Sequence, residues 1–410
     1  KDLVYTKDSK KIANVLKKND FKVKREYYVN DFGNQVKVVL TKSIKRQAGL
    51  DIEIEEGEDI YSGEYIEDVA RKIKKSKGIK WITENFEKVG EEAAEIILRD
   101  YVKKDIKHVG IKFDRWFSEK ELYSKKIVSR MWNYLKDKNL VYEENGAYWL
   151  KTSEYGDEKD RVLKTSDGNF TYLMSDIAYL YERLGIRKLD KVIMIVGADH
   201  HGYLGRIYAA EKILGFKDKL QVIVSQMVKL ERDGQEVRMS KRKGNFVTLR
   251  EVAEEIGLDA TRYFFVSKNL DSHMVIDLDL AKEESSNNPI YYIQYASARI
   301  NSVLNKVEKS EEKSKKKEHK GSDEFDKYEL ALIRKLSYYP ELIKETGKNS
   351  EVYRIAFYTL DLAEAFHKFY DNCRIIGDQK EKARLKIVKA TKIVLEDSLG
   401  LMGIVAKKKM

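Results

Sequence analysis

The chain has 410 residues, 42% of them hydrophobic, which indicates a folded protein with more than one hydrophobic core and excludes a disordered chain. Its 79 basic and 68 acidic residues leave a formal charge of +11, which favours a polyanionic partner such as nucleic acid. Cys373 is the only cysteine, so an internal disulfide and a multi-cysteine zinc site are excluded.

The sequence also bears on the cellular compartment. The first residues, KDLVYTKDSKK, contain no apolar core of a secretory signal, and no stretch approaches the roughly 18 apolar residues of a membrane span. A single cysteine is typical of a reducing interior. We therefore expect a cytoplasmic protein without a membrane partner.

The N-terminal third begins with a short helical pattern over residues 12–16 and a strand-like parity pattern over residues 21–29. From Tyr61 to about Ala147 the pattern becomes helical and highly charged, with a strand-like alternation at residues 109–113. These features predict an α+β insertion, over residues 61–165, between two parts of one larger domain.

The segment from Ser166 to Leu184 places Tyr172 and Asp176 four residues apart. On a helix this spacing puts both side chains on one face, where a phenol and a carboxylate can converge on one ligand. A carboxylate binds a guanidinium bidentately, which an ammonium cannot reproduce. The alternative is structural: Asp176 caps or solvates the helix and Tyr172 belongs to the core.

The next elements predict a βαβ unit. Residues 192–196 form a continuous apolar run, a helical pattern follows, and residues 220–224 form a second strand. Ligands of such units bind at the carboxyl ends of the strands, where Gly197, Asp199, His200 and His201 lie. No third ligand is placed to complete a zinc site with the adjacent histidines, so no metal site is predicted.

A cationic segment follows. Asp233 and Gly234 separate two short alternating segments, which predicts a tight β-hairpin. Directly afterwards, residues 238–245 (RMSKRKGN) combine four cations, a hydroxyl and a glycine. Such a loop can wrap a polyphosphate and neutralise charge that moves during nucleotidyl transfer; the alternative is an ordinary solvated surface loop.

The sequence pattern of the C-terminal third predicts helices. Residues 249–266 predict a helix broken at Gly257, and apolar residues recur at helical spacing over 293–307, 352–373 and 385–399. The charged run from Glu308 to Lys320 predicts an exposed loop between the first two of these helices. We therefore expect an α-helical bundle from Asn287 onward.

Several motifs carry a resemblance to a known family. RMSKRKGNFVTLREV, from Arg238, resembles the signature loop of class I aminoacyl-tRNA synthetases and looks most like the arginyl enzymes. REYYVNDFGNQV, LDATRYFF, YYIQYASARI and AFHKFYDNCR are similar to further segments of the same family. The family's first, His-Ile-Gly-His type signature has no match: residues 5–9 read YTKDS, and no histidine precedes His108.

The resemblance implies an α/β fold, with a Rossmann-like parallel-sheet catalytic domain, an α+β insertion and an all-α anticodon-binding helical bundle. The implied boundaries are residues 1–60 and 166–248 for the catalytic domain, 61–165 for the insertion, 249–286 for a stem-contact region and 287–410 for the bundle.

The resemblance also implies site residues. ATP would be bound by Gly197, Asp199, Val228, Met239, Ser240 and Lys241, with Lys241 and Arg238 as catalytic cations at the phosphates. Arginine would be bound by Tyr172, Asp176 and His200, and the tRNA anticodon loop by Tyr292, Tyr295, Tyr370 and Met410, the last residue of the sequence.

The implied reaction is ATP-dependent activation of L-arginine and its transfer to the 3′ end of tRNA(Arg), with Mg²⁺ arriving on the ATP rather than in a protein-held site. We expect a monomer. Two alternatives stay open at this point: a non-catalytic tRNA-binding relative that lacks the first ATP signature, and a class I synthetase for another amino acid.

Overall fold

The computed structural model describes residues 3–33, 35–54, 60–237, 247–269, 272–311 and 324–410. Its residues fall into two compact units, which we describe separately. One comprises Glu26–Met227, and the other comprises Lys1–Arg25, Val228–Arg238 and Val247–Met410. Among the described residues, no helix has the length and apolar character that a membrane crossing requires.

The unit Glu26–Met227 begins with two short parallel strands from distant parts of the chain. Strand β1 (Glu26–Val29) pairs with β2 (Arg115–Ser118) in parallel register. The prediction that a strand begins at residue 21 was wrong, because Phe21 is exposed and residues 21–25 join no ladder. The strand predicted at residues 109–113 was also misplaced: Val109 and Ile111 are buried in the connection that leads from a helix to β2.

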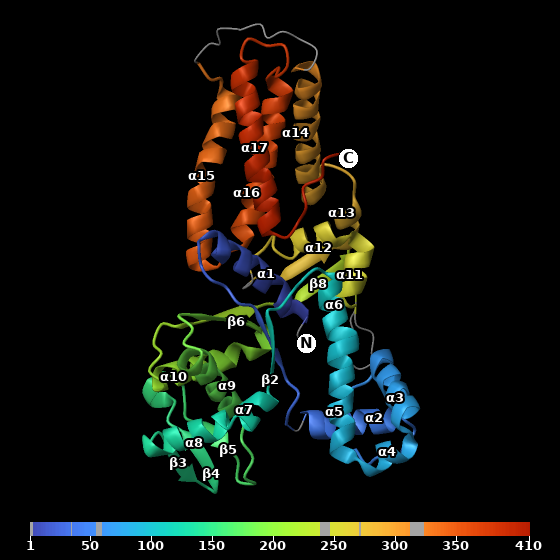
Figure 1. Cartoon of the computed structure of the whole chain (residues 1–410), viewed down its shortest axis with the longest axis vertical. Helices are drawn as coiled ribbons and strands as arrows, with labels where there is room; N and C mark the ends of the chain where they lie inside the picture. Colours follow the sequence, from blue (N-terminus) through green and yellow to red (C-terminus); the bar gives the residue numbers. More distant parts are fainter. Residues whose placement is uncertain (1–2, 34, 55–59, 238–246, 270–271, 312–323) are drawn as a thin grey trace. The chain divides into compact units, whose positions relative to one another are not determined.

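A cluster of helices connects β1 to β2. It consists of a π-helical turn η1 (Gln35–Leu40), α2 (Thr41–Gln47), α3 (Glu64–Lys77), α4 (Ile79–Glu84), α5 (Phe86–Ile97), a second π-helical turn η2 (Leu98–Val102) and α6 (Lys103–His108). Figure 1 shows α2 to α5 gathered together. Apolar side chains at helical spacing, among them Ile44, Ile66 and Val89, form their buried core.

Gly90 permits the closest approach within this cluster. A Cβ atom at this position of α5 would lie 2.0 Å from the carbonyl oxygen of Val36 and 2.5 Å from Oγ1 of Thr41. Both groups belong to the segment that packs on α5, so only a residue without a side chain fits here.

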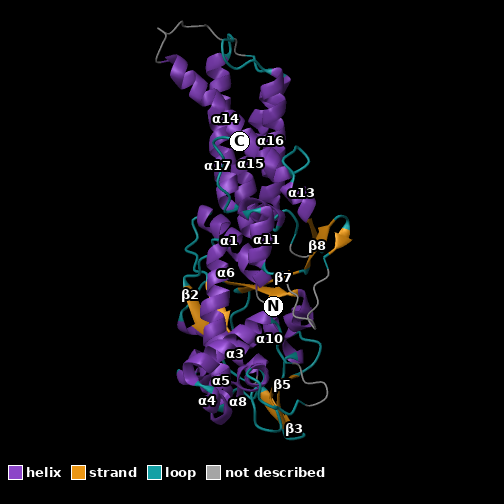
Figure 2. Cartoon of the chain, turned by 90° about the vertical axis from the view of Figure 1, so that its right-hand side faces the viewer, coloured by secondary structure: helices purple, strands orange, loops and turns teal. Residues whose placement is uncertain are grey.

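A second core follows β2. It is built by α7 (Lys120–Ser124), α8 (Ile127–Asp137), α9 (Tyr172–Tyr181) and a π-helical turn η4 (Glu182–Ile186) around Phe117, Met131 and Ile177. An antiparallel sheet, β3 (Val141–Glu144), β4 (Ala147–Leu150) and β5 (Arg161–Lys164), belongs to the same part, and the short 3₁₀ turn η3 (Ser153–Tyr155) joins β4 to β5. Figure 2 shows β3 and β5 close to each other.

The predicted βαβ unit is confirmed. Strand β6 (Val192–Gly197) leads through a 3₁₀ segment η5 (Ala198–Tyr203) and α10 (Leu204–Ile213) to β7 (Leu220–Ser225). The two strands are parallel, in register from the pair Val192–Leu220 to the pair Gly197–Ser225.

Ion pairs fix β1 against its neighbours. The carboxylate of Glu26 accepts two hydrogen bonds from Arg187, both of 2.8 Å. The buried Glu182 accepts from Arg187 at 2.9 Å and from Arg115 at 3.1 Å. This paired set joins β1, β2 and η4, and each buried carboxylate in it has a guanidinium partner.

The other unit contains α1 (Leu3–Lys18) and a small sheet, in which β8 (Val228–Arg232) pairs with β9 (Gln235–Glu236) and with β10 (Met274–Asp277). The predicted hairpin is confirmed, since Asp233 and Gly234 have the positive φ values, 51° and 69°, of a type I′ turn. The predicted break at Gly257 (φ 80°) separates α11 (Leu249–Ile256) from α12 (Leu258–Phe264), and α13 (Leu278–Lys282) follows β10.

Four long helices complete this unit: α14 (Pro289–Glu311), α15 (Lys327–Asn349), α16 (Tyr353–Asn372) and α17 (Glu381–Leu401). They lie side by side in Figures 1 and 2, which confirms the predicted bundle. Their apolar faces meet at residues such as Ile300, Leu362 and Phe366. The loop predicted from Glu308 begins too early, because α14 continues to Glu311; residues 312–323 lie outside the described part.

Candidate functional site

Two polar side chains lie at the carboxyl ends of the parallel strands β1 and β2. Asn30 directly follows β1 and Glu119 directly follows β2. The backbone N–H of Glu119 donates to the carbonyl of Val29 at 3.0 Å, which extends the ladder by one residue and fixes the position of Glu119. The side chain of Glu119 is buried, with 4% exposure.

Burial and neighbouring carboxylates together raise the pKa of Glu119 to about 7. Burial is the largest cause, and the negative charges of Asp176 and Asp31 add to it. Hydrogen bonds from the Ser175 and Tyr28 hydroxyls act in the opposite direction. Glu119 thus lies in the field of a second carboxylate, Asp176, and is partly protonated near neutral pH.

Polar side chains surround this pair. With its amide nitrogen turned toward Glu119, Asn30 donates to Oε2 of Glu119 at 3.0 Å. The hydroxyls of Tyr123 and Ser175 lie 3.0 Å apart. Burial raises the pKa of Tyr28 well above its usual range, so this phenol stays protonated and remains a hydrogen-bond donor.

The predicted pair Tyr172 and Asp176 lies on α9 and faces the same carboxylate. Glu119 acts electrostatically on the Tyr172 phenol and Asp176 acts on Glu119. Tyr172 is 54% exposed, which contradicts the alternative that it is a core residue. Asp176 lies inside α9 and accepts a hydrogen bond from the Tyr203 phenol, so it does not cap the helix.

The chemistry of this arrangement suits a flat cation. Glu119 and Asp176 offer carboxylate oxygens from two directions, and the exposed Tyr172 ring can border the ligand. A planar guanidinium presents several N–H donors to such a pair, whereas an ammonium is a point charge. The sequence analysis did not predict Glu119 as a site residue. The feature that could have indicated it is an acidic residue immediately after a strand.

The predicted ATP-binding residues are only partly described. Gly197 is the last residue of β6 and pairs with Ser225 of β7, at the carboxyl edge expected for a ligand. Val228 begins β8 in the other unit. The side chains of Asp199 and His200, and the whole of Arg238, Met239, Ser240 and Lys241, lie outside the described part.

The predicted tRNA-binding tyrosines come together on α14 and α16. The His367 ring lies 4.4 Å from the ring of Tyr292 and 5.6 Å from that of Tyr295, measured between centroids. The Arg299 guanidinium lies 4.7 Å from the Tyr295 ring and 4.6 Å from the Tyr370 ring. Sequence reasoning named the three tyrosines and missed His367 and Arg299, although each lies one helical turn from a named tyrosine.

The segment that leads to Met410 is held on α14. The buried Gln294 donates to the carbonyl of Val405 at 2.9 Å and accepts from the N–H of Lys407 at 2.8 Å. Ser297 donates to the carbonyl of Lys407 at 2.9 Å. Met410 itself is 48% exposed.

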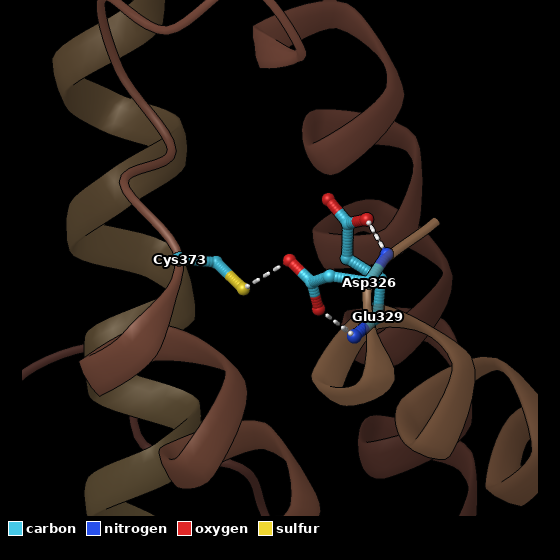
Figure 3. Close-up of side chains that lie close together, drawn as sticks. All are labelled: Asp326, Glu329 and Cys373. Atoms are coloured by element: carbon cyan, nitrogen blue, oxygen red, sulfur yellow. Dashed lines mark hydrogen bonds between the residues drawn. The ribbon is translucent and has the colours of Figure 1, made fainter. Parts of the chain in front are cut away.

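One described cluster has the spacing of a metal site. Asp326, Glu329 and Cys373 place one ligand atom each within 4.8 Å of one another (Figure 3). Hydrogen bonds already use these atoms: Cys373 donates to Asp326 at 3.2 Å, Asp326 caps α15, and the buried Arg384 donates to Glu329 at 2.6 Å. Burial and Asp326 raise the pKa of Cys373 to about 12, so a thiolate ligand is disfavoured. The cluster is therefore a helix cap neutralised by an arginine.

A hollow of about 540 Å³ lies in the helical cluster of the unit Glu26–Met227. Its wall carries Asp51 and Glu53 as well as the buried Lys45, which donates to the carbonyl of Thr83 at 3.0 Å and lies 4.9 Å from the centroid of the Phe86 ring. Charges of both signs line it.

Comparison with known proteins assigns both parts of the chain to described domain families. Residues 6–305 match the family model of the catalytic domain of class I tRNA synthetases (R), and residues 293–410 match the DALR anticodon binding domain. Arginine–tRNA ligase 1 of Halalkalibacterium halodurans is 39% identical over 411 aligned residues, covering 97% of this chain and 73% of the relative. The arginine–tRNA ligase of Bacillus subtilis is 38% identical with the same coverage.

Solved structures give the same result. A crystal structure from Campylobacter jejuni, assigned to the arginyl-tRNA synthetases, has a TM-score of 0.85 and 33% identity, covering 99% of this chain and 89% of that one. Arginyl-tRNA synthetase of Thermus thermophilus has a TM-score of 0.75 at 20% identity, with coverage of 100% and 79%, and supports the fold alone.

The fold and the two matched domains define a class I aminoacyl-tRNA synthetase: parallel strands and a βαβ unit in the catalytic part, followed by a helical anticodon-binding domain. Within this class, the chain belongs to the arginine–tRNA ligase family. The relatives favour this assignment over a non-catalytic tRNA-binding protein and over a synthetase for another amino acid.

Proposed function

We propose that Glu119, Asp176 and Tyr172 bind the side chain of L-arginine. The observation that carries this proposal is the buried Glu119 at the carboxyl end of β2, which faces the partly buried Asp176 of α9 beside an exposed phenol. A guanidinium would pair with both carboxylates and displace the proton held by Glu119. His200 follows the carboxyl end of β6 and is proposed to border the same amino acid.

We propose that ATP binds at the carboxyl end of β6, with Gly197 and Asp199 at the ribose. Val228, Met239, Ser240 and Lys241 would complete the nucleotide site, and Lys241 and Arg238 would neutralise the phosphates as pyrophosphate leaves. Mg²⁺ would arrive with the nucleotide and screen its charge. The acidic cluster at Asp326 does not fit as its site, because Arg384 already provides the counter-charge there.

The proposed reaction is that of the arginine–tRNA ligase family. The carboxylate of arginine attacks the α-phosphate of ATP and expels pyrophosphate, and a ribose hydroxyl of the terminal adenosine of tRNA(Arg) then attacks the adenylate and releases AMP. Neither step needs a covalent bond to the protein, so positioning and charge stabilisation carry the rate.

The anticodon end of the tRNA is proposed to meet α14 and α16. Tyr295 and Tyr370 present rings beside a guanidinium, and unpaired bases stack on such surfaces for about 1–3 kcal/mol each. Tyr292 and Met410 would extend the contact. The positive net charge of the chain supports attraction of a polyanion.

We further propose a cytoplasmic monomer with the domain boundaries given above: residues 1–60 and 166–248, 61–165, 249–286, and 287–410. Sedimentation analysis of the purified chain tests the oligomeric state. A dimer at micromolar concentration would refute the monomer.

Arginine-dependent exchange of pyrophosphate into ATP, measured with and without tRNA(Arg), tests the central proposal. We expect Glu119→Gln and Asp176→Asn to raise the KM for arginine by about 10- to 150-fold, the range for losing a hydrogen bond to a charged group. Tyr172→Phe should have a smaller effect. Glu121→Gln is the matched control, because its carboxylate pairs with Arg115. Unchanged KM values in both carboxylate variants would remove the proposed pocket.

A further inference from the structure

The residues between α14 and α16 form a continuous ladder. In order, it runs Tyr292, His367, Tyr295, Arg299 and Tyr370, with a ring or guanidinium contact at each step. Tyr295 is 40% exposed, whereas His367, in the middle of the ladder, is 5% exposed. His367 therefore cannot offer its ring face to a ligand; it supports groups that can.

The contacts of His367 specify its protonation state. Its Nδ1 lies 3.3 Å from Nη1 of Arg299, and its Nε2 lies 3.3 Å from the carbonyl oxygen of Tyr292. A guanidinium only donates, so Nδ1 must accept; a carbonyl only accepts, so Nε2 must carry the hydrogen. Both bonds exist together only in the neutral imidazole with the proton on Nε2.

Arg299 is held from several sides. Besides His367, Nη1 donates to Asp371 at 3.1 Å and Nη2 donates to the Tyr295 phenol at 3.2 Å. The rings of Tyr295 and Tyr370 lie at similar distances from its guanidinium carbon. Nε–H and the second Nη2–H have no hydrogen-bond acceptor among the described residues, so these donors remain for a ligand.

We propose that His367 is a positioning residue for tRNA binding: in its neutral form it holds Arg299 between Tyr295 and Tyr370, and its protonation releases Arg299 and weakens the complex. The inference rests on the proposed contact of this face with the anticodon end. The ligand chemistry is that of an RNA loop, a phosphate or base oxygen for Arg299 beside bases that stack on the two tyrosines.

The electrostatic surroundings agree with this role. Burial is the largest effect on the pKa of His367 and lowers it, and the positive charge of Arg299 lowers it further. The hydrogen bond to the Tyr292 carbonyl and the negative charge of Asp371 raise the pKa, but the net result is a decrease. Among the described residues, Glu364 and Lys368 of α16 also act electrostatically on Tyr292 of α14. A protonated His367 would place an N–H against the guanidinium at Nδ1 and lose that hydrogen bond.

Direct binding of a tRNA(Arg) transcript tests the inference, with Kd measured from pH 5.0 to 8.0 at constant ionic strength. For the unmodified chain we expect affinity to be constant near neutral pH and to fall by about threefold or more toward pH 5.0. His367→Gln can accept from Arg299 and donate to the Tyr292 carbonyl, so it should retain affinity and lose the pH dependence. His367→Phe keeps an aromatic ring without either bond and should bind weakly at every pH.

Arg299→Ala distinguishes failure of the proposed tRNA contact from failure of the proposed role of His367, because it removes the ligand contact itself. We expect its Kd to rise by about tenfold or more. If Arg299→Ala binds normally, this face does not bind tRNA and the proposed function of the face fails. If Arg299→Ala binds weakly but His367→Phe binds normally, or if His367→Gln retains the pH dependence, only the role of His367 is overturned. Melting temperatures of all variants show whether each one is folded, and the pH profile is independent of that measurement.

Discussion

The proposed contact of Glu119 with arginine predicts that arginine binding depends on pH. Burial, Asp176 and Asp31 raise its pKa to about 7 in the free protein. A bound guanidinium would stabilise the ionised form and lower this pKa, so binding below pH 7 must expel a proton. Arginine affinity is therefore to be measured from pH 5 to pH 8. Glu119→Gln is the matched variant, because its side chain has no proton to expel.

The magnitude follows from the ionised fraction of Glu119. With a pKa of about 7, about one tenth of the free molecules are ionised at pH 6 and about one hundredth at pH 5, and the apparent Kd rises by the inverse of that fraction. The Kd for arginine should therefore be about tenfold higher at pH 6 than at pH 8, and about a hundredfold higher at pH 5.

Isothermal titration calorimetry of arginine, with tRNA(Arg) present and absent, measures this effect. Titrations at pH 6 in two buffers of different ionisation enthalpy should show the release of close to one proton per arginine bound. Glu119→Gln should bind more weakly at pH 8, show no proton release, and approach the unmodified chain at pH 5. A flat pH profile, or equal proton release by both proteins, would refute the assignment of Glu119.

The same pKa shift has a consequence for stability. The pKa of Glu119 in the folded protein, about 7, lies above the ordinary glutamate value of 4.5. Between these two values the folded state holds a proton that the unfolded state has lost, so the contribution of Glu119 to the free energy of unfolding falls as pH rises from about 4.5 to about 7. Arginine should stabilise the protein most strongly above pH 7.

Three further predictions test the fold and the phosphate site. Gly90→Ala should lower the free energy of unfolding, measured in urea, by about 1–3 kcal/mol or more, because its Cβ would lie 2.0 Å from a backbone carbonyl of η1. Gly400→Ala is the control: its Cβ would have nothing within 4 Å, so it should stabilise the protein by up to about 1 kcal/mol. Arg384→Ala should cost about 3–5 kcal/mol, since among the described residues it leaves the buried Glu329 with only the longer ion pair to Lys380, at 3.7 Å. A loss below about 1 kcal/mol, as at an exposed pair, would contradict this. Lys241→Ala should slow arginine-dependent pyrophosphate exchange by orders of magnitude while the Kd for tRNA(Arg) stays nearly constant, and equal exchange rates would exclude its proposed role.

Local patterns were sufficient for much of the fold. The Asp233–Gly234 turn, the βαβ unit from Val192 to Ser225 and the helical bundle depend on spacings of two to four residues, which the sequence displays directly. The motif at Arg238 and the segments YYIQYASARI and AFHKFYDNCR also indicated the family from the sequence alone.

The tertiary structure decided which side chains share a site. Glu119 and Asn30 become neighbours because β1 and β2 pair in parallel, although a whole helical cluster separates them in the chain. His367 and Arg299 meet because α14 packs on α16. The physical reason is that burial, through-space charge and hydrogen-bond partners, unlike helical or strand periodicity, depend on residues far away in sequence. Burial and charge set the pKa of Glu119, and the partners Arg299 and Tyr292 set the tautomer of His367.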